Sequence, residues 1–443
     1  MSGLLITRAE LGGRLADVRV RGGLVTEIGE LRPDRAELVV DARGGAILPG
    51  LHDHHLHLLS LAAASASVRC GPPEVTCAGD LARVLRTAPG TWVRGIGYHE
   101  SVAGVLDRHT LDRLVATRPV RIQHRGGALW MLNTRALTEL GLLADHDDGL
   151  LWRSDALLRE RLGQREPPDL AAVGRRLASL GITGVTDATP DLSEDAIRLL
   201  TGAALPQRLH LLGVPSFARL GPRVTAGPWK ILPPDHEPPD YDALLREITR
   251  VHATRRPVAI HAVTRESAVV ALAALRQAGP RRGDRIEHAA LIGLDMLPML
   301  ASLGLTVVTQ PGFAVERGEQ YRRDVPRADQ ADLYRYASLR HAGIKVAPSS
   351  DAPFTSEDPW AVIAAAATRD LAPAERVTPR QALDGLLTPL DDPGGAPRRV
   401  VVGAPADLCL LHVPLADALS APNADLVAAT VCGGRLQAAG PLP

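Results

Sequence analysis

The sequence has little lysine, cysteine or aromatic residue, and it has no excess of charge of either sign. Across 443 residues, 50 Lys and Arg residues balance 50 Asp and Glu residues. Because its net charge is zero, the chain should not attract nucleic acid, an anionic membrane or a highly charged substrate by long-range electrostatics. We therefore expect no nucleic-acid partner.

The four cysteines do not form a pattern that would hold a small fold together. Cys70, Cys77, Cys409 and Cys432 include no C-x-x-C pair. Such scattered cysteines are typical of buried thiols in a reducing compartment. A disulfide scaffold is therefore not expected.

Long apolar segments are also missing. The first residues, MSGLLITRAELGGR, have no basic region followed by an apolar core and a small-residue cleavage site. The apolar run around residues 56–68 is interrupted by serines and is shorter than the ~20 residues of a membrane span. We expect a cytoplasmic protein without a membrane partner.

Lysine is rare enough that its positions carry information. Of the 50 basic residues, Lys230 and Lys345 are the two lysines, and the others are arginines. Because lysine is so rare in this chain, the sequence around each of the two lysines is informative about its role.

The two ends of the chain have a strand pattern. Short alternating runs separated by Gly-rich turns fill residues 1–48, and similar runs, ADLCLLHVPL and VAATVCGGRL, lie within residues 390–443. These segments predict one small β-sandwich domain built from both termini. The length of the chain allows such a domain beside one large α/β domain.

Residues 49–389 alternate apolar runs with helical patterns, the order that produces a parallel sheet with crossover helices. Helices are expected at residues 169–181, 241–253, 266–279 and 330–343. The apolar runs are AILPGLHDHHLH, RPVRIQH, GITGVTDAT, QRLHLLGV, GPWKILP, RPVAIHAV, GDRIEHAAL, GLTVVTQP and GIKVAPSSD. We predict an α/β fold of the (β/α)8 TIM-like barrel type, in which either RPVRIQH or QRLHLLGV is the ninth, supernumerary strand.

The first of these strands contains four histidines. His55 and His57 are two residues apart, so both side chains leave the same face of a strand, and neutral imidazoles at this spacing suit Zn²⁺ or a similar ion. His52 and His54 would occupy the opposite face. The spacing alone does not decide which pair binds a metal.

Other predicted strands end in residues that can bind a metal or move a proton. They are Lys230 in GPWKIL, His261 in VAIHAV, His288 in RIEHAAL and Asp351 in PSSDAPF. Barrel enzymes build their active sites from residues at the carboxyl ends of the strands. Taken one at a time, each could instead be a packed histidine, a surface lysine or a turn aspartate.

The ordered motifs resemble those of the amidohydrolase superfamily, in particular the amidohydrolase family 3 subgroup that includes N-substituted formamide deformylase-like proteins. The resemblance covers nearly the whole chain. It rests on PGLHDHHLH, a W-x-x-N-x-x-A-L stretch starting at Trp130, GITGVTDAT, GPWKIL, VAIHAV, GDRIEHAAL, VVTQPGF, and SSDAPF followed by DPW.

The resemblance implies a set of site residues. It assigns the metal pair to His55 and His57 and leaves His52 and His54 with packing roles. It also implies metal ligands at the remaining positions, which are Lys230, His261, His288 and Asp351.

Lys230 and Asp351 have special chemistry in this set. A protonated lysine has no lone pair, so Lys230 could bind metal only after CO₂ adds to its amine and forms an N6-carboxylated side chain. Asp351 would contact the metal and act as the general base toward the attacking water. The implied cofactors are one or two divalent ions, with zinc expected.

The expected function is metal-dependent hydrolysis of an amide-like carbon–nitrogen bond, other than a peptide bond, in a small molecule. The same centre could instead hydrolyse a cyclic amide, an imine, or an ester or lactone. A catalytically silent metal-binding barrel protein is the alternative from another class, because fold alone does not establish activity. Homo-oligomer formation is left open.

Five residues near predicted strand ends or in loops are expected to orient the substrate. They are Arg125, Trp130, Arg265, Arg285 and Gln310. The chain also departs from the family pattern at two places: Ala128 stands where a histidine is usual, and PPDHEPPD follows the strand of Lys230. These departures weaken any transfer of substrate identity.

Overall fold

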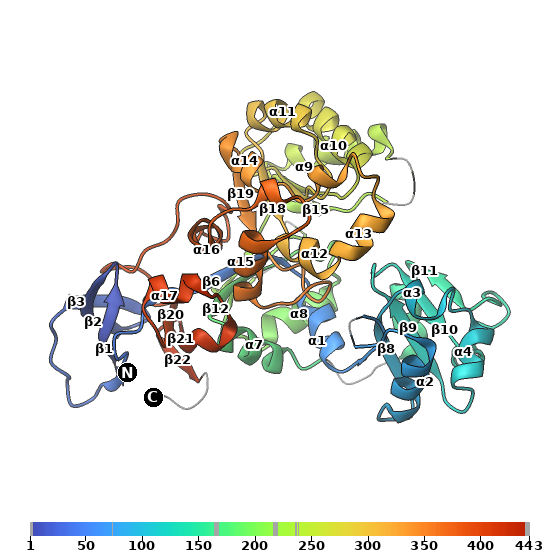
Figure 1. Ribbon diagram of the computed structural model, residues 1–443, viewed down its shortest axis with the longest axis horizontal. Coiled ribbons are helices and arrows are strands. Elements are labelled where there is room, and N and C mark those ends of the chain that lie inside the picture. Colours follow the sequence, from blue (N-terminus) through green and yellow to red (C-terminus); the bar gives the residue numbers. More distant parts are fainter. Residues whose placement is uncertain are drawn as a thin grey trace. The chain divides into compact units, whose positions relative to one another are not determined.

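The computed structural model describes residues 3–72, 74–163, 168–215, 220–234, 237 and 239–438 (Figure 1). The chain forms two compact units, one of Met1–Leu58 with Leu170–Pro443 and one of Leu59–Asp169. The sequence patterns did not single out the second unit. Each unit is described by itself.

The larger unit contains two parallel sheets. The first has the order β14-β13-β12-β6, and the second has the order β15-β16-β17-β18-β19. Their strands are β6 (Leu51–Leu56), β12 (Ile182–Asp187), β13 (Arg208–Leu211), β14 (Val224–Ala226), β15 (Trp229–Ile231), β16 (Val258–Ala262), β17 (Arg285–His288), β18 (Thr306–Thr309) and β19 (Lys345–Pro348). Every residue of β6, β12, β17 and β18 is buried, as in parallel strands covered on both faces.

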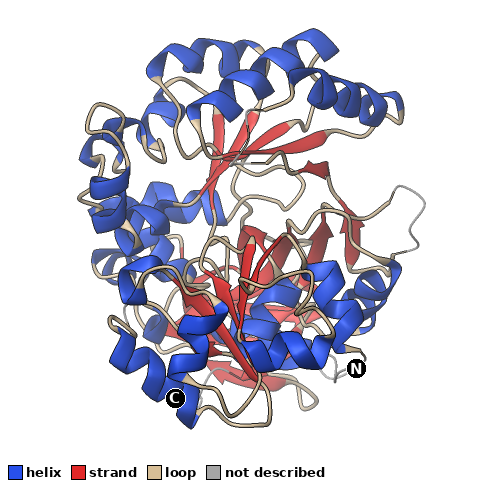
Figure 2. Ribbon diagram, turned by 90° about the vertical axis from the view of Figure 1, so that its right-hand side faces the viewer, coloured by secondary structure: helices blue, strands red, loops and turns tan. Residues whose placement is uncertain are grey.

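Helices lie beside these sheets, as Figure 2 shows in blue and red. The α-helices are α7 (Leu170–Ser179), α8 (Glu194–Gly202), α9 (Tyr241–Ala253), α10 (Arg265–Ala278), α11 (Leu297–Ser302), α12 (Pro311–Glu316), α13 (Gly318–Asp324), α14 (Ala337–His341), α15 (Pro359–Thr368), α16 (Pro379–Leu386) and α17 (Leu415–Ser420). Short 3₁₀ helices cover Leu294–Met296, Gln330–Asp332, Pro373–Glu375 and Ala424–Leu426. In the described part of the chain, no helix is long and apolar enough to cross a membrane.

Two further sheets of this unit come from the ends of the chain. They have the orders β3-β2-β1-β4 and β22-β21-β20-β5. Their strands are β1 (Leu4–Leu11), β2 (Arg14–Arg21), β3 (Leu24–Gly29), β4 (Leu38–Asp41), β5 (Ile47–Pro49), β20 (Leu408–Leu411), β21 (Val427–Cys432) and β22 (Arg435–Ala438). One hydrophobic cluster joins the two sheets, since it includes Ile6 and Val18 from one and Leu408 and Val431 from the other.

The smaller unit has its own sheet, in the order β11-β10-β9-β8-β7. Its elements are α1 (Leu58–Ser65), β7 (Val68–Arg69), α2 (Ala78–Thr87), β8 (Val93–Tyr98), α3 (Glu100–Ala103), α4 (Arg108–Leu114), β9 (Val120–His124), β10 (Leu129–Leu132), α5 (Thr134–Leu140), β11 (Leu150–Trp152) and α6 (Asp155–Leu162). The run RPVRIQH is β9 of this sheet, whereas QRLHLLGV supplies β13. RPVRIQH is therefore the strand that stands apart from the parallel sheets.

The W-x-x-N stretch is part of the folding of this smaller unit. The Asn133 Oδ1 atom accepts a hydrogen bond from the Ala136 backbone N–H at 2.9 Å and so caps α5. The Trp130 indole N–H donates to Asp155 Oδ1 at 3.0 Å. The W-x-x-N pattern is therefore explained by the capping role of Asn133 and the packing of Trp130.

The expected helices at 169–181, 241–253 and 266–279 are present as α7, α9 and α10. The expectation of one helix over residues 330–343 is wrong, because only Gln330–Asp332 and Ala337–His341 are helical there. Leu333 forms an isolated bridge with Leu291, and the Tyr334 N–H donates to the Ala290 carbonyl at 2.8 Å. These tertiary contacts pull the backbone out of the helix in the middle of the segment.

His210 on β13 predicts a pH dependence of folding. It is 3% exposed, and its Nδ1 atom lies 2.8 Å from Thr225 Oγ1. Burial, reinforced by the charges of Arg285 and Arg256, lowers the pKa of His210 to about 3. The unfolded chain therefore binds a proton between pH 6.5 and 3 that the folded chain does not bind, so the stability that neutral His210 provides is lost as the pH falls through this range.

We expect His210→Gln to reduce the acid sensitivity of the protein. Going from pH 7 to pH 5 should cost wild type about 2 kcal/mol more than the variant. Urea unfolding of both proteins at the two pH values measures this difference. Equal losses of stability would contradict the prediction.

Candidate metal centre

Strand β6 is unusual because its fully buried residues include three histidines and an aspartate. His52 Nδ1–H donates to the Thr388 carbonyl at 2.8 Å, and His54 Nε2 lies 2.9 Å from Thr388 Oγ1. These two histidines therefore pack against the segment that follows α16. They do not join the group formed by His55 and His57.

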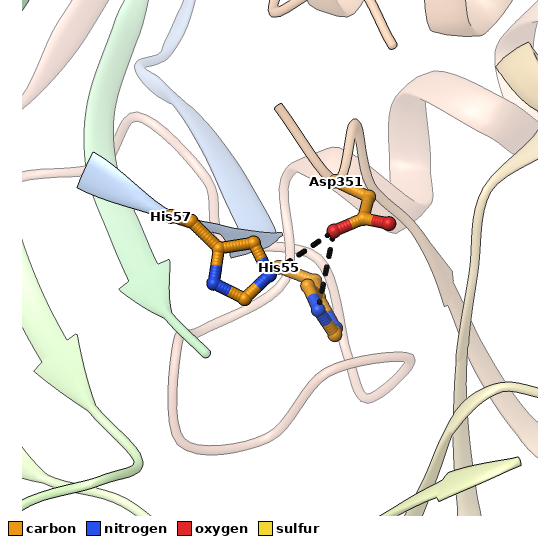
Figure 3. Close-up of side chains that lie close together, drawn as sticks. All are labelled: His55, His57 and Asp351. Atoms are coloured by element: carbon orange, nitrogen blue, oxygen red, sulfur yellow. Dashed lines mark ion pairs between the residues drawn. The ribbon is translucent and has the colours of Figure 1, made fainter. Parts of the chain in front are cut away.

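His55, His57 and Asp351 converge at the carboxyl ends of β6 and β19 (Figure 3). Asp351 Oδ1 lies 3.5 Å from His55 Nε2 and 3.3 Å from His57 Nε2. One potential ligand atom from each residue lies within 4.8 Å of the other two. This spacing allows one cation to contact all three.

The chemistry of these atoms fits a metal ion. His55 Nε2 and Asp351 Oδ1 are buried, and neither has a hydrogen-bond partner among the described residues. A carboxylate oxygen and a deprotonated imidazole nitrogen both present lone pairs, so their approach is costly without a proton or a cation between them. Histidine nitrogen and carboxylate oxygen are also the donors that Zn²⁺ accepts.

Backbone contacts hold this group together. The Asp351 N–H donates to the His55 carbonyl at 2.8 Å, and the His57 N–H donates to the Ala352 carbonyl at 2.9 Å. Asp351 has a φ of 60° and His288 a φ of 68°, in the left-handed region that costs non-glycine residues energy. Such backbone geometry is common at functional sites, where it aims a side chain inward.

Asp53 adds a second link between β6 and the segment after β19. It accepts hydrogen bonds from the His55 N–H at 3.1 Å and from the Ser350 N–H at 3.2 Å, and it also contacts the Ser350 hydroxyl. Burial raises the pKa of Asp53 to about 6, although these hydrogen bonds oppose the shift. The residue fixes the loop that carries Asp351, a role that the sequence patterns did not reveal.

The other three expected ligands lie around this group. The His288 ring centroid is 4.7 Å from that of His55 and 4.6 Å from that of His261. Lys230 is 3% exposed on β15, and its charge acts on both His55 and His288. The structure therefore brings all six residues to one region, with His55, His57 and Asp351 in the tightest contact.

The buried histidines are in the form that a metal requires. Burial lowers the pKa of His55 and His288 well below the usual value. The charge of Lys230 adds to this shift at His55, and that of His261 adds to it at His288. Both imidazoles are therefore neutral near pH 7 and offer a lone pair.

Three side chains contact the Nδ1 atoms of the histidines. The sequence patterns did not identify Thr189 or Glu287, and they assigned Gln310 to the substrate. His57 Nδ1 lies 3.1 Å from Thr189 Oγ1, and His288 Nδ1 lies 2.9 Å from Gln310 Oε1. His55 Nδ1 forms an ion-pair contact with Glu287. Glu287 could have been suspected, because a carboxylate within a buried strand needs a partner.

The residues expected to orient substrate have varied surroundings. Arg285 is 1% exposed and its Nε–H donates to Glu287, while Arg265 pairs with Asp329 and Asp332. Gln310 lies against His288, and its Nε2–H donates to Ser349 Oγ at 2.9 Å. Arg125 and Trp130 belong to the smaller unit, where Trp130 is buried on β10.

Comparisons with known proteins bear on the family to which the chain belongs. Residues 38–437 match the amidohydrolase family. N-substituted formamide deformylase of Arthrobacter pascens is 25% identical over 454 residues, covering 84% of this chain and 83% of the relative. An uncharacterized metal-dependent hydrolase from Pyrococcus horikoshii superposes with a TM-score of 0.73 at 19% identity, over 98% of this chain and 100% of that one.

A second solved structure shares the fold more distantly. N-isopropylammelide isopropylaminohydrolase from Burkholderia multivorans superposes with a TM-score of 0.54 at 17% identity, and 98% of each chain is covered. The family match and the deformylase relative, together with the histidines and the carboxylate at the strand ends, define the class of this chain as a metal-dependent hydrolase of carbon–nitrogen bonds. The chain belongs to the amidohydrolase family.

We expect His57→Asn to lower the bound metal from wild-type stoichiometry, because it removes one of the three converging donors. His52→Asn is the matched control, since His52 lies on β6, the strand that ends directly before His57, but contacts Thr388. Elemental analysis of both purified variants measures the metal content. Full retention of metal by His57→Asn would refute its place among the ligands.

Proposed function

We propose that this enzyme hydrolyses an amide-like carbon–nitrogen bond of a small molecule, with Asp351 as the general acid and base. Asp351 would accept a proton from the attacking water and later pass it to the leaving nitrogen. The observation that carries the proposal is the contact of Asp351 Oδ1 with both His55 and His57 at 3.3–3.5 Å. A carboxylate in this position can reach a water that the centre holds.

We also propose the ligands of the centre. One or two divalent ions, with zinc preferred, would be held by six side chains, which are His55, His57, Lys230, His261, His288 and Asp351. When bound, such an ion lowers the pKa of water and polarises the substrate carbonyl. The burial of Lys230 beside two neutral histidines supports an N6-carboxylated side chain, because a carboxylated lysine would neutralise cationic charge in the centre.

The proposed fold around the centre is a (β/α)8 barrel over residues 49–389, with Leu59–Asp169 inserted after its first strand. Two observations support closure of the two parallel sheets into one barrel. Only Gly227 and Pro228 separate β14 from β15, and the hydrogen bond from Asp351 to His55 joins the ends of β19 and β6. The cluster shared by the terminal sheets supports a β-sandwich from residues 1–48 and 390–443.

Substrate orientation by Arg125, Trp130 and Arg265 stays a prediction from the sequence, and the burial of Trp130 on β10 favours a packing role for it instead. Burial and the contact with Glu287 favour a positioning role for Arg285, and the contact with His288 favours the same for Gln310. A small-molecule substrate and a cytoplasmic location complete the proposal. The location is supported by four cysteines that are all free thiols.

Asp351→Asn should lower kcat/KM by about 10² to 10⁴ on the best substrate of a panel of N-formyl amides, N-acyl amides, cyclic amides and lactones. Asp392→Asn is the control, because Asp392 is a surface aspartate that pairs with Lys345. Steady-state kinetics on both variants measure the effect. Hydrolysis of lactones alone would contradict an amide-like substrate, and failure of metal-loaded wild type on every compound would favour a silent barrel protein.

Lys230→Ala should reduce both bound metal and activity, because the variant cannot form a carboxylated side chain. Formate or acetate added to the variant should restore part of the activity by supplying the missing carboxylate. Lys345→Ala removes the other lysine of the chain, which is exposed, and should behave as wild type. Unchanged metal content and turnover in Lys230→Ala would refute a carboxylated lysine in the centre.

A further inference from the structure

We propose that Glu287, held by Arg285, is a positioning residue that directs the Nε2 atom of His55 to the metal and strengthens its binding. The inference rests on the proposed metal centre and deepens it. Neither Glu287 nor Arg285 needs to touch the substrate for this role.

The first argument is the contact of Glu287 with His55. Glu287 Oε2 pairs with His55 Nδ1, and both side chains are fully buried. A carboxylate accepts the Nδ1–H, so the lone pair of the imidazole is left on Nε2. Nε2 is the atom that faces Asp351 Oδ1 at 3.5 Å and has no hydrogen-bond partner among the described residues.

The second argument is a difference among the histidines. His57 Nδ1 faces the hydroxyl of Thr189, and His288 Nδ1 faces the amide oxygen of Gln310. Among these three, His55 alone has a carboxylate within hydrogen-bond distance of its Nδ1 atom, since Asp351 Oδ2 lies 3.8 Å from His288 Nδ1. A carboxylate behind a metal-binding imidazole fixes the ring and makes its other nitrogen more basic.

The third argument concerns Arg285. It is two residues before Glu287 on β17, so both side chains leave the same face of the strand. Its Nε–H donates to Glu287 Oε1, which leaves Oε2 for His55. Each carboxylate oxygen therefore has a different partner. Arg285 is 1% exposed, and its hydrogen bond holds the Glu287 carboxylate beside His55.

The chain offers a matched control at another buried pair. Glu375 is 1% exposed and accepts a hydrogen bond from Arg335 Nη1 at 2.6 Å. It also accepts backbone hydrogen bonds from Tyr336 and Ser338. Glu375→Gln disturbs a buried Arg–Glu pair as Glu287→Gln does, but its partners include none of the proposed ligands.

The test is a titration of metal-stripped protein with Zn²⁺ and Co²⁺ against a chelating competitor. Glu287→Gln should weaken binding by about 10-fold to 100-fold, and Glu375→Gln should leave it unchanged. The Co²⁺ absorption spectrum should also change in Glu287→Gln alone. At a metal concentration that restores occupancy, KM should equal that of wild type, because Glu287 is fully buried behind His55.

Arg285→Lys provides a second variant if Glu287→Gln does not fold. It keeps a cation near the carboxylate but loses the Nε–H geometry, so metal affinity should fall by a smaller factor, roughly tenfold or less. Wild-type affinity in a folded Glu287→Gln or Arg285→Lys protein would overturn the inference, as would equal losses in Glu375→Gln. A wild-type protein that binds neither ion would instead refute the proposed metal centre itself.

Discussion

The approach of three electron-pair donors, His55 Nε2, His57 Nε2 and Asp351 Oδ1, is the constraint on which the rest of the structure depends. Such atoms repel one another in a buried site, and the fold must hold them there. It does so with backbone hydrogen bonds between Asp351 and His55 and between His57 and Ala352. Because β6 and β19 are far apart in the sequence, these bonds make the site depend on the assembly of the whole larger unit.

Sequence was most informative where a chemical requirement coincides with a strand end. The order of the histidine, lysine and aspartate motifs placed His55, Lys230, His261 and Asp351 at or beside parallel strands, and they lie there. Periodicity did not choose between His55 with His57 and His52 with His54. The two pairs differ in the residues that they face. His52 and His54 face Thr388 and contact it.

Other features depend on contacts that no local pattern encodes. The separate unit of Leu59–Asp169 has strand and helix patterns like those of a barrel, so its RPVRIQH run looked like one more strand of the same sheet. The break in the helix expected over 330–343 results from the bridge between Leu291 and Leu333. Glu287 was hidden for a similar reason, since its partner His55 is 232 residues away in the sequence.

The two lysines of the chain, which composition alone does not distinguish, have different surroundings in the structure. Lys345 is exposed and pairs with Asp392, the ordinary arrangement of a surface lysine. Lys230 is buried, and its charge adds to the effect of burial, which lowers the pKa of His55 and His288. As an ammonium it would therefore oppose a metal cation as well as protonation of the histidines. A carboxylated Lys230 would reverse the sign of this interaction, so the electrostatics of the site and the supply of metal ligands favour the same chemical form.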